Sequence, residues 1–272
     1  MDKSPVPRPL VFVAAEVRTA YTPALIDDAM IAAITTSVPS LVVPHREQRT
    51  TFTWGAEKLP GQSQETALRL MDKASGFSLM LTTSSVTLET TRYPGIDVFS
   101  QIFQKCIEVA SEVARPAIVE RVGLRYVNEL RSPSPIERIL DWREVVNSDA
   151  LCMVAGAEVA LRGTGLPEDA VTDTAGYQSV YAAKLSGNRA VTMRLVALES
   201  GSVIGPTPLR RESPASNDPL FVVDLDGFWP REHGDANDFD PQALVKTLLS
   251  LHAPIEDLFL WATTDHFRSV AL

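Results

Sequence analysis

The stretch AIVERVGLRYVNEL, residues 117–130, lies near the middle of this chain and predicts how the rest is arranged. Its apolar and charged residues alternate, so an extended chain would place Val122 and Leu124 on one face and Arg121 and Arg125 on the other. This period of two is typical of a strand with one face on a hydrophobic core. We therefore expect a central strand here, with its charged face turned away from the core.

In the rest of the chain, some segments have the apolar spacing of strands and others that of helices, and proline, glycine and polar residues separate them. Strands are also predicted at residues 10–19, 41–54, 66–81 (bent near Gly76), 85–91, 154–162, 176–185, 190–199 and 220–228. Helices are predicted at residues 23–38, 96–114, 135–146 and 241–261, where apolar residues recur at helical spacing. Pro254 should kink or restart the last of these helices.

The order of these elements appears twice. Residues 1–115 and residues 116–272 each run strand, helix, several strands, helix, and the string RPLVF at residues 8–12 recurs as RPAIV at residues 115–119. Runs of adjacent strands followed by helices indicate antiparallel sheets with helices packed on one face. The sequence therefore predicts an α+β fold of two similar, closely associated repeats, with a groove between them.

Charge and hydropathy restrict the classes of function. The net charge is −9, and residues 116–272 hold most of it, with 22 acidic against 14 basic side chains. This argues against nonspecific nucleic-acid binding, and it fits either a basic protein partner or simple solubility, which we favour. An apolar membrane span and a signal peptide are not recognisable, so a cytoplasmic location is expected. Cys106 and Cys152 lie in apolar sequence and are expected to be buried thiols.

Residues 121–128, RVGLRYVN, resemble the motif R-[IV]-G-L-R-Y-[IV]-N of a sporadically distributed bacterial family of uncharacterised proteins of about this length. Glu16, the string DLDGFW at residues 224–229 and the closing helix with His252 are similar too. The resemblance extends over nearly the whole chain but implies no activity. A sporadic distribution implies accessory or horizontally moved genes, such as those of defence or toxin–antitoxin loci.

Asp224 and Asp226 lie two residues apart in a predicted strand, so both carboxylates should point to one face. Paired carboxylates can hold a divalent metal or share acid and base roles. No further ligand has suitable spacing, so we predict no metal and no cofactor. The alternative, which we favour, is that the two aspartates face Arg121 or Arg125 across the sheet.

Arg18 and Arg125 occupy equivalent places in the two predicted repeats. They could form a paired anion-binding feature in the groove, or each could pair with a carboxylate such as Glu16 or Glu129. We favour the structural role, because a partly buried arginine usually has a carboxylate partner. The candidates for ligand or partner binding are Arg18, Arg121, Arg125, Asn128, Asp224 and Asp226.

Two classes of function fit these observations. The preferred one is a non-enzymatic binding or interaction protein with a protein partner, such as an accessory or neutralising, antitoxin-like component of a bacterial defence or toxin locus. The alternative is an enzyme or a protein that binds a small anion or metabolite in the polar groove between the repeats. No catalytic residue is predicted, and the oligomeric state is left open.

Overall fold

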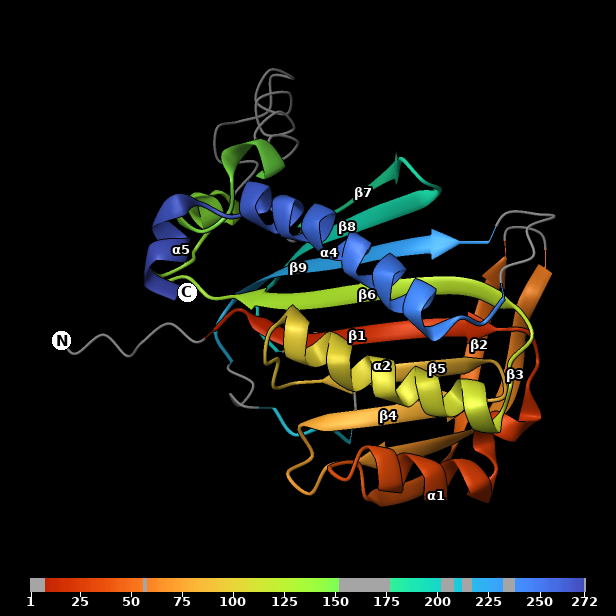
Figure 1. Cartoon of the computed structure of the whole chain (residues 1–272). Coiled ribbons are helices and arrows are strands. Elements are labelled where there is room, and N and C mark those ends of the chain that lie inside the picture. Colours follow the sequence, from red (N-terminus) through yellow and green to blue (C-terminus); the bar gives the residue numbers. More distant parts are fainter. Residues whose placement is uncertain are drawn as a thin grey trace.

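The computed structural model describes residues 8–55, 58–151, 177–201, 208–211, 217–231 and 238–271, and for residues 49–55 and 58–64 it describes the backbone only. Nine strands form one antiparallel sheet in the order β2-β3-β4-β5-β1-β6-β9-β8-β7 (Figure 1). The strands are β1 (Leu10–Thr19), β2 (Val43–Gly55), β3 (Lys58–Met71), β4 (Phe77–Thr82), β5 (Ser85–Thr90), β6 (Val119–Leu130), β7 (Tyr177–Leu185), β8 (Arg189–Leu198) and β9 (Leu220–Pro230).

The helices pack against this sheet, and Figure 1 shows α1, α2 and α4 lying across the same face of it. The helices and short 3₁₀ turns are η1 (Pro23–Ile26), α1 (Asp28–Ser37), α2 (Ile96–Val113), η2 (Ile139–Glu144), η3 (Ser148–Leu151), α4 (Pro241–Ala262) and α5 (Asp265–Ala271). The fold is therefore α+β, as predicted. The opposite face of the sheet, which carries Glu16 and Arg18 of β1 and Arg121 and Arg125 of β6, is called the open face below.

The two halves of the chain share this one sheet. β1 and β6 lie side by side in its middle, and their antiparallel pairing places Val17 opposite Val122 and Ala15 opposite Leu124. These apolar residues point toward the helices and are buried. The prediction of a central strand at residues 117–130 is therefore confirmed, and its apolar face lies on the main core.

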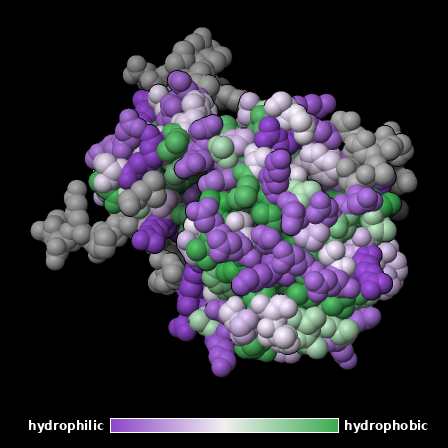
Figure 2. Space-filling model, viewed as in Figure 1, coloured by the Kyte–Doolittle hydropathy of each residue, from purple (hydrophilic) through white to green (hydrophobic). Residues whose placement is uncertain are grey.

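Helix α4 approaches the sheet closely at Gly227 of β9. A Cβ atom at this position would lie 2.9 Å from Cδ1 of Ile255 and 3.3 Å from Cβ of Leu251, both on α4. The missing side chain thus lets the helix backbone come near the strand. Hydrophilic residues predominate on the outer surface of the helices in Figure 2, with hydrophobic ones showing between them, as expected of amphipathic helices on a core.

The prediction of one bent strand over residues 66–81 is wrong. β3 ends at Met71 and β4 begins at Phe77, with a tight turn between them. The carboxylate of Asp72 accepts hydrogen bonds from the backbone N–H of Gly76 (2.7 Å) and of Phe77 (3.0 Å). Ser75 adopts a left-handed conformation with φ of 54°. This is the turn chemistry of aspartate followed by serine and glycine, and it reverses the chain where a bend was expected.

Two predicted helices are shorter than expected. The helix predicted at residues 23–38 is split into η1 and α1, and the Thr22 hydroxyl before it donates to the carbonyl of Ala20 (2.8 Å) and does not cap η1. Residues 135–146 form only the short turn η2, because Asp141 accepts hydrogen bonds from the backbone N–H of Glu137 and Arg138. These contacts close a local turn in place of a longer helix.

Helix α4 runs from Pro241 to Ala262 through Pro254, so the last helix does not restart at this proline. Its N-terminus is capped by Asp240, whose side chain accepts a hydrogen bond from the N–H of Gln242 (2.9 Å). The strand predicted at residues 154–162 lies outside the described residues. None of the described helices is long and apolar enough to span a membrane.

Cys106 lies on the buried face of α2, as predicted. Burial disfavours the charged thiolate and raises the pKa of this thiol to about 12. Cys106 is therefore an inert part of the core. Cys152 lies outside the described residues.

Candidate functional site

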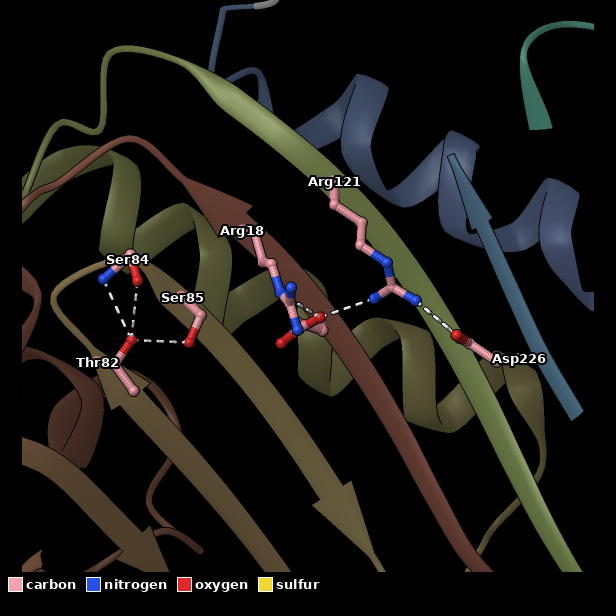
Figure 3. Close-up of polar contacts among 7 residues, drawn as sticks. Arg18, Thr82, Ser84, Ser85, Arg121 and Asp226 are labelled. Carbon is pink, nitrogen blue, oxygen red and sulfur yellow. Dashed lines mark hydrogen bonds and ion pairs between the residues drawn. The ribbon is translucent and has the colours of Figure 1, made fainter. Parts of the chain in front are cut away.

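Arg121 lies at the centre of the open face, between carboxylates of the two neighbouring strands (Figure 3). Its Nη1 donates to Oε2 of Glu16 on β1 at 2.7 Å. Its Nη2 donates to both carboxylate oxygens of Asp226 on β9, at 2.9 Å and 2.7 Å. The guanidinium carbon also lies 5.0 Å from the centre of the Phe228 ring. One cation thus joins three strands in the middle of the sheet.

Gly123, two residues after Arg121, provides the space for this arrangement. It lies opposite Glu16 on one side and Phe228 on the other. A Cβ atom at Gly123 would lie 2.2 Å from Nη1 of Arg121, so the guanidinium occupies the volume that a side chain would fill. The glycine of the central motif therefore permits Arg121 to fold back over its own strand.

We expect Gly123→Ala to displace the guanidinium of Arg121 and to lower the free energy of unfolding by about 1–3 kcal/mol, because the ion pairs it breaks are only partly buried. Urea denaturation measures this change. The control is the same substitution in an Arg121→Ala background, where the expected further loss is below about 0.5 kcal/mol. An equal loss in both backgrounds would mean that the methyl group strains something other than Arg121.

A second ion pair, between Arg125 of β6 and Asp224 of β9, extends the network along these two strands. Nε and Nη2 of Arg125 donate to the two carboxylate oxygens of Asp224 at 2.8 Å and 2.7 Å. The hydrogen bonds that Arg125 donates to Asp224 raise the pKa of Arg125. Burial raises the pKa of Asp226 against the lowering effect of Arg121. The favoured alternative, in which each aspartate faces an arginine across the sheet, is confirmed. Half of the Arg125 side chain is exposed, so we expect this pair to contribute no more than about 1 kcal/mol.

Arg18 is the most exposed arginine of the group. Its Nε donates to Oε2 of Glu16 at 3.0 Å, and 58% of its side chain is accessible to solvent. Among the described residues, the structure shows no partner for its two terminal nitrogens. These N–H groups remain available to a molecule bound on the open face.

A third network, around Arg69 of β3, lies farther along the open face. The Arg69 side chain is only 7% exposed. Its Nη1 donates to Glu89 (2.5 Å) and to Ser78 (2.6 Å), and its Nη2 donates to Glu47 (3.1 Å). Burial lowers the pKa of Arg69, but the charge and hydrogen bonds of Glu89 and Glu47 outweigh this and raise it. Arg69 therefore stays charged and holds two carboxylates in place.

Hydroxyl groups from β4, β5 and the turn between them form another part of the open face (Figure 3). Oγ1 of Thr82 lies 2.9 Å from Oγ of Ser85 and 3.5 Å from Oγ of Ser84, and it accepts a hydrogen bond from the N–H of Ser84 at 3.2 Å. Each of these hydroxyls can both donate and accept a hydrogen bond. They line one side of a hollow, and the charged side chains around Arg121 line another side of it.

This hollow is a cavity of about 710 Å³. It is lined from β1 and β6 by charged side chains, from β4 and β5 by hydroxyls and Glu89, and by apolar groups that include Phe12 and Met80. Twelve of the sixteen lining residues are polar or charged. The candidate functional site is therefore a polar cavity built from both halves of the chain.

Five of the six residues predicted as binding candidates belong to this region. Arg18, Arg121, Arg125 and Asp226 line the cavity, and Asp224 pairs with Arg125 beside it. Asn128 is buried elsewhere and donates from Nδ2 to the carbonyl of Val223 (3.2 Å). Further polar residues of this face were not predicted, although charged and hydroxyl residues alternate with apolar ones in their strands: Arg69, Glu89, Thr82, Ser85 and Thr87.

The other face of the central motif carries a hydrogen-bonded aromatic cluster. The hydroxyl of Tyr126 lies 2.7 Å from the hydroxyl of Tyr93 and 3.2 Å from Nδ1 of His252 on α4. Burial raises the pKa of both tyrosines, so both stay protonated near neutral pH. The cluster satisfies the polar ends of rings that pack between the sheet and its helices, which is a structural role.

In the part of the chain that the structure describes, no group of three or more His, Cys, Asp or Glu side chains is placed to hold a metal ion. No protein-family model matches the chain, and no curated protein matches it. The resemblance of residues 121–128 to a bacterial family stays a prediction.

Proposed function

We propose that this is a non-enzymatic binding protein, and that its ligand occupies the cavity on the open face of the sheet. The observation that carries the proposal is the cavity itself. Its volume of about 710 Å³ is within the usual range for sites that bind small molecules. It lies on the open face over β1 and its neighbours β5 and β6, and both halves of the chain contribute lining residues.

The charged groups of the cavity are arranged for recognition. Glu16 and Asp226 both accept hydrogen bonds from the one guanidinium of Arg121, and Gly123 leaves the space in which that guanidinium lies. Side chains held by each other in this way keep a fixed geometry without a ligand. Because these donors and acceptors are already ordered, the entropic cost of ordering side chains on binding is smaller.

We further propose that the two halves, residues 1–115 and residues 116–272, are repeats of one α+β unit. Strand order supports this. From the centre outward, β1 is followed by β5, β4, β3 and β2, and β6 is followed by β9, β8 and β7. The described part of each half begins with its central strand, and α2 and α4, which come after the last strand of each half, cover the same face of the sheet (Figure 1).

A second candidate function is a cytoplasmic interaction protein with a protein partner, such as a neutralising component of a bacterial defence or toxin locus. Edge strand β7 favours it, because Val180 and Tyr181 are 60% and 50% exposed there. The acidic balance of residues 116–272 would suit a basic partner. An exposed edge strand with apolar side chains can accept an added strand from a partner.

The test compares the native protein with a variant whose cavity is filled. The full chain would be purified from its source under native conditions, and bound small molecules would be identified by mass spectrometry after denaturation. We expect a stoichiometric small molecule with the wild type and none with Ala14→Phe, which places a ring in the cavity. The control is Thr192→Phe, on β8 of the same face and not among the residues that line the cavity, which should keep wild-type occupancy.

A small molecule retained by Ala14→Phe would place the binding site elsewhere. A stoichiometric protein partner that binds wild type and Ala14→Phe equally, without any small molecule, would support the second candidate. Loss of that partner in Val180→Asp and Tyr181→Asp would then locate it at β7.

A further inference from the structure

The hydroxyl of Thr87 has no hydrogen-bond partner among the described residues. Thr87 lies on β5, between Met80 of β4 and Glu16 of β1, and it is only 5% exposed. It belongs to the lining of the cavity. A buried hydroxyl without a partner destabilises the folded protein, and such groups are uncommon in native structures. The floor of the cavity thus carries a polar group that a ligand could satisfy.

The other polar groups of the cavity offer donors and acceptors together. Arg18 presents free N–H groups, and Thr82, Ser84 and Ser85 present hydroxyls. Glu16 has a second carboxylate oxygen, Oε1, for which the structure gives no partner among the described residues. A ligand that matches both kinds of group must donate and accept at several points. A hydroxyl does both at once, whereas a phosphate or carboxylate only accepts.

The charge of the cavity lining disfavours anionic ligands. Five carboxylates and three guanidiniums line the cavity, so an anion would meet an excess of negative charge. Arg121 is already shared between Glu16 and Asp226, and Glu89 is held by Arg69. These paired charges offset one another, and the remaining hydrogen-bonding groups, together with the carboxylates of Glu65 and Glu120, surround a small apolar floor that includes Phe12.

We propose that the cavity binds an uncharged, polyhydroxylated small molecule of the chemical class of the neutral sugars. This inference rests on the proposed binding function and names its ligand class. Hydroxyls of the ligand bond to Thr87, to the hydroxyls of the β4–β5 turn and to Arg18 and Glu16. The apolar face of a sugar ring fits against Phe12, because such rings combine polar edges with C–H faces.

Thr87→Val tests this proposal, because it removes the hydroxyl and keeps the branched shape. Two effects of opposite sign are expected. Without ligand, the variant should melt at the wild-type temperature or above, because the unsatisfied hydroxyl is gone. With ligand, affinity should fall about tenfold, because a bond to the sugar is lost. The matched control is Thr192→Val on the same face outside the cavity, which should leave affinity unchanged.

The probes are a panel of neutral mono- and disaccharides that covers the common stereoisomers, titrated into the full chain by ligand-observed NMR and calorimetry. Glucose 6-phosphate, gluconate and glucosamine are the charged counterparts. Saturable binding of a neutral sugar, weakened by Thr87→Val and by Ala14→Phe but not by Thr192→Val, supports the proposal. Binding of a neutral sugar that Thr87→Val leaves unchanged overturns it.

Charged ligands separate this inference from the function on which it rests. If an anion or a cation fills the cavity and no neutral sugar binds, the inference fails and the binding function stands. If no sugar binds and the natively purified protein carries no small molecule that Ala14→Phe abolishes, both fail.

Discussion

Replacing Glu129 with alanine is expected to lower the free energy of unfolding by about 3–5 kcal/mol. Its side chain is only 2% exposed. The two carboxylate oxygens accept hydrogen bonds from Nη1 and Nη2 of Arg211 at 2.9 Å and 2.7 Å. The substitution removes the ion pair with Arg211, whose side chain is itself mostly buried, and the longer contact of Oε2 with Nη2 of Arg131 at 3.6 Å. Chemical denaturation monitored by fluorescence measures the loss.

Glu129→Ala should also loosen the segment of chain around Arg210 and Arg211, which lies between β8 and β9 in the sequence. The N–H of Arg210 donates to the carbonyl of Ser75 (2.7 Å), and the hydroxyl of Thr91 donates to the carbonyl of Arg210 (2.7 Å). Since Arg211 loses its two hydrogen bonds to Glu129, the Arg210 amide should exchange with solvent faster. Glu112→Ala, on the exposed side of α2, is the control and should change stability by less than about 0.5 kcal/mol. Equal stability of the two variants would show that the Glu129–Arg211 pair contributes nothing.

The elements that the sequence predicted well are those whose pattern is local. The alternation around residues 117–130 and the helical spacing of residues 96–114 both follow from contact with the core, so β6 and α2 lie where expected. The errors occur where a polar side chain bonds to nearby backbone. Asp72 and Asp141 each close a turn through their carboxylates, and hydrophobic periodicity contains no information about this.

The part of the candidate site that could be predicted also follows from a local pattern. Alternation in β6 and β9 placed Arg121, Arg125, Asp224 and Asp226 on one face, because both strands were recognised. Arg69 could not be joined to its partners in this way. Its contacts depend on the register of β2, β3, β4 and β5, and strand register between distant segments is set by the folded sheet.

Gly123 also escaped prediction as part of the site. In the sequence it is a residue that weakens a strand, without a side chain to pack. Only the folded structure shows that the guanidinium of Arg121 fills the space beside it. A glycine among alternating charged residues of a central strand can thus indicate a long side chain that lies across the strand.

Arg69→Met is expected to cost about 3–5 kcal/mol of stability, a loss comparable to that of Glu129→Ala. Methionine keeps most of the length of the side chain and its apolar stem, so the change mainly removes the charge and its hydrogen bonds. Glu89, whose side chain is 14% exposed, and Glu47 then both lack their cation. Because Glu89 lines the cavity, ligand binding should weaken together with stability. Thermal melts and calorimetry with the bound small molecule measure the two effects.

A second substitution separates charge from packing in this prediction. Glu89→Gln in the Arg69→Met background removes the carboxylate that lost its partner, so it should recover part of the stability, whereas Glu89→Gln alone should be destabilising. Such coupling would show that Arg69 acts by neutralising Glu89 on the open face. If the double variant is no more stable than Arg69→Met, the loss arises instead from the contacts of the guanidinium with Ser78 and Met80. Glu89 would then tolerate an unpaired charge because the cavity beside it admits water.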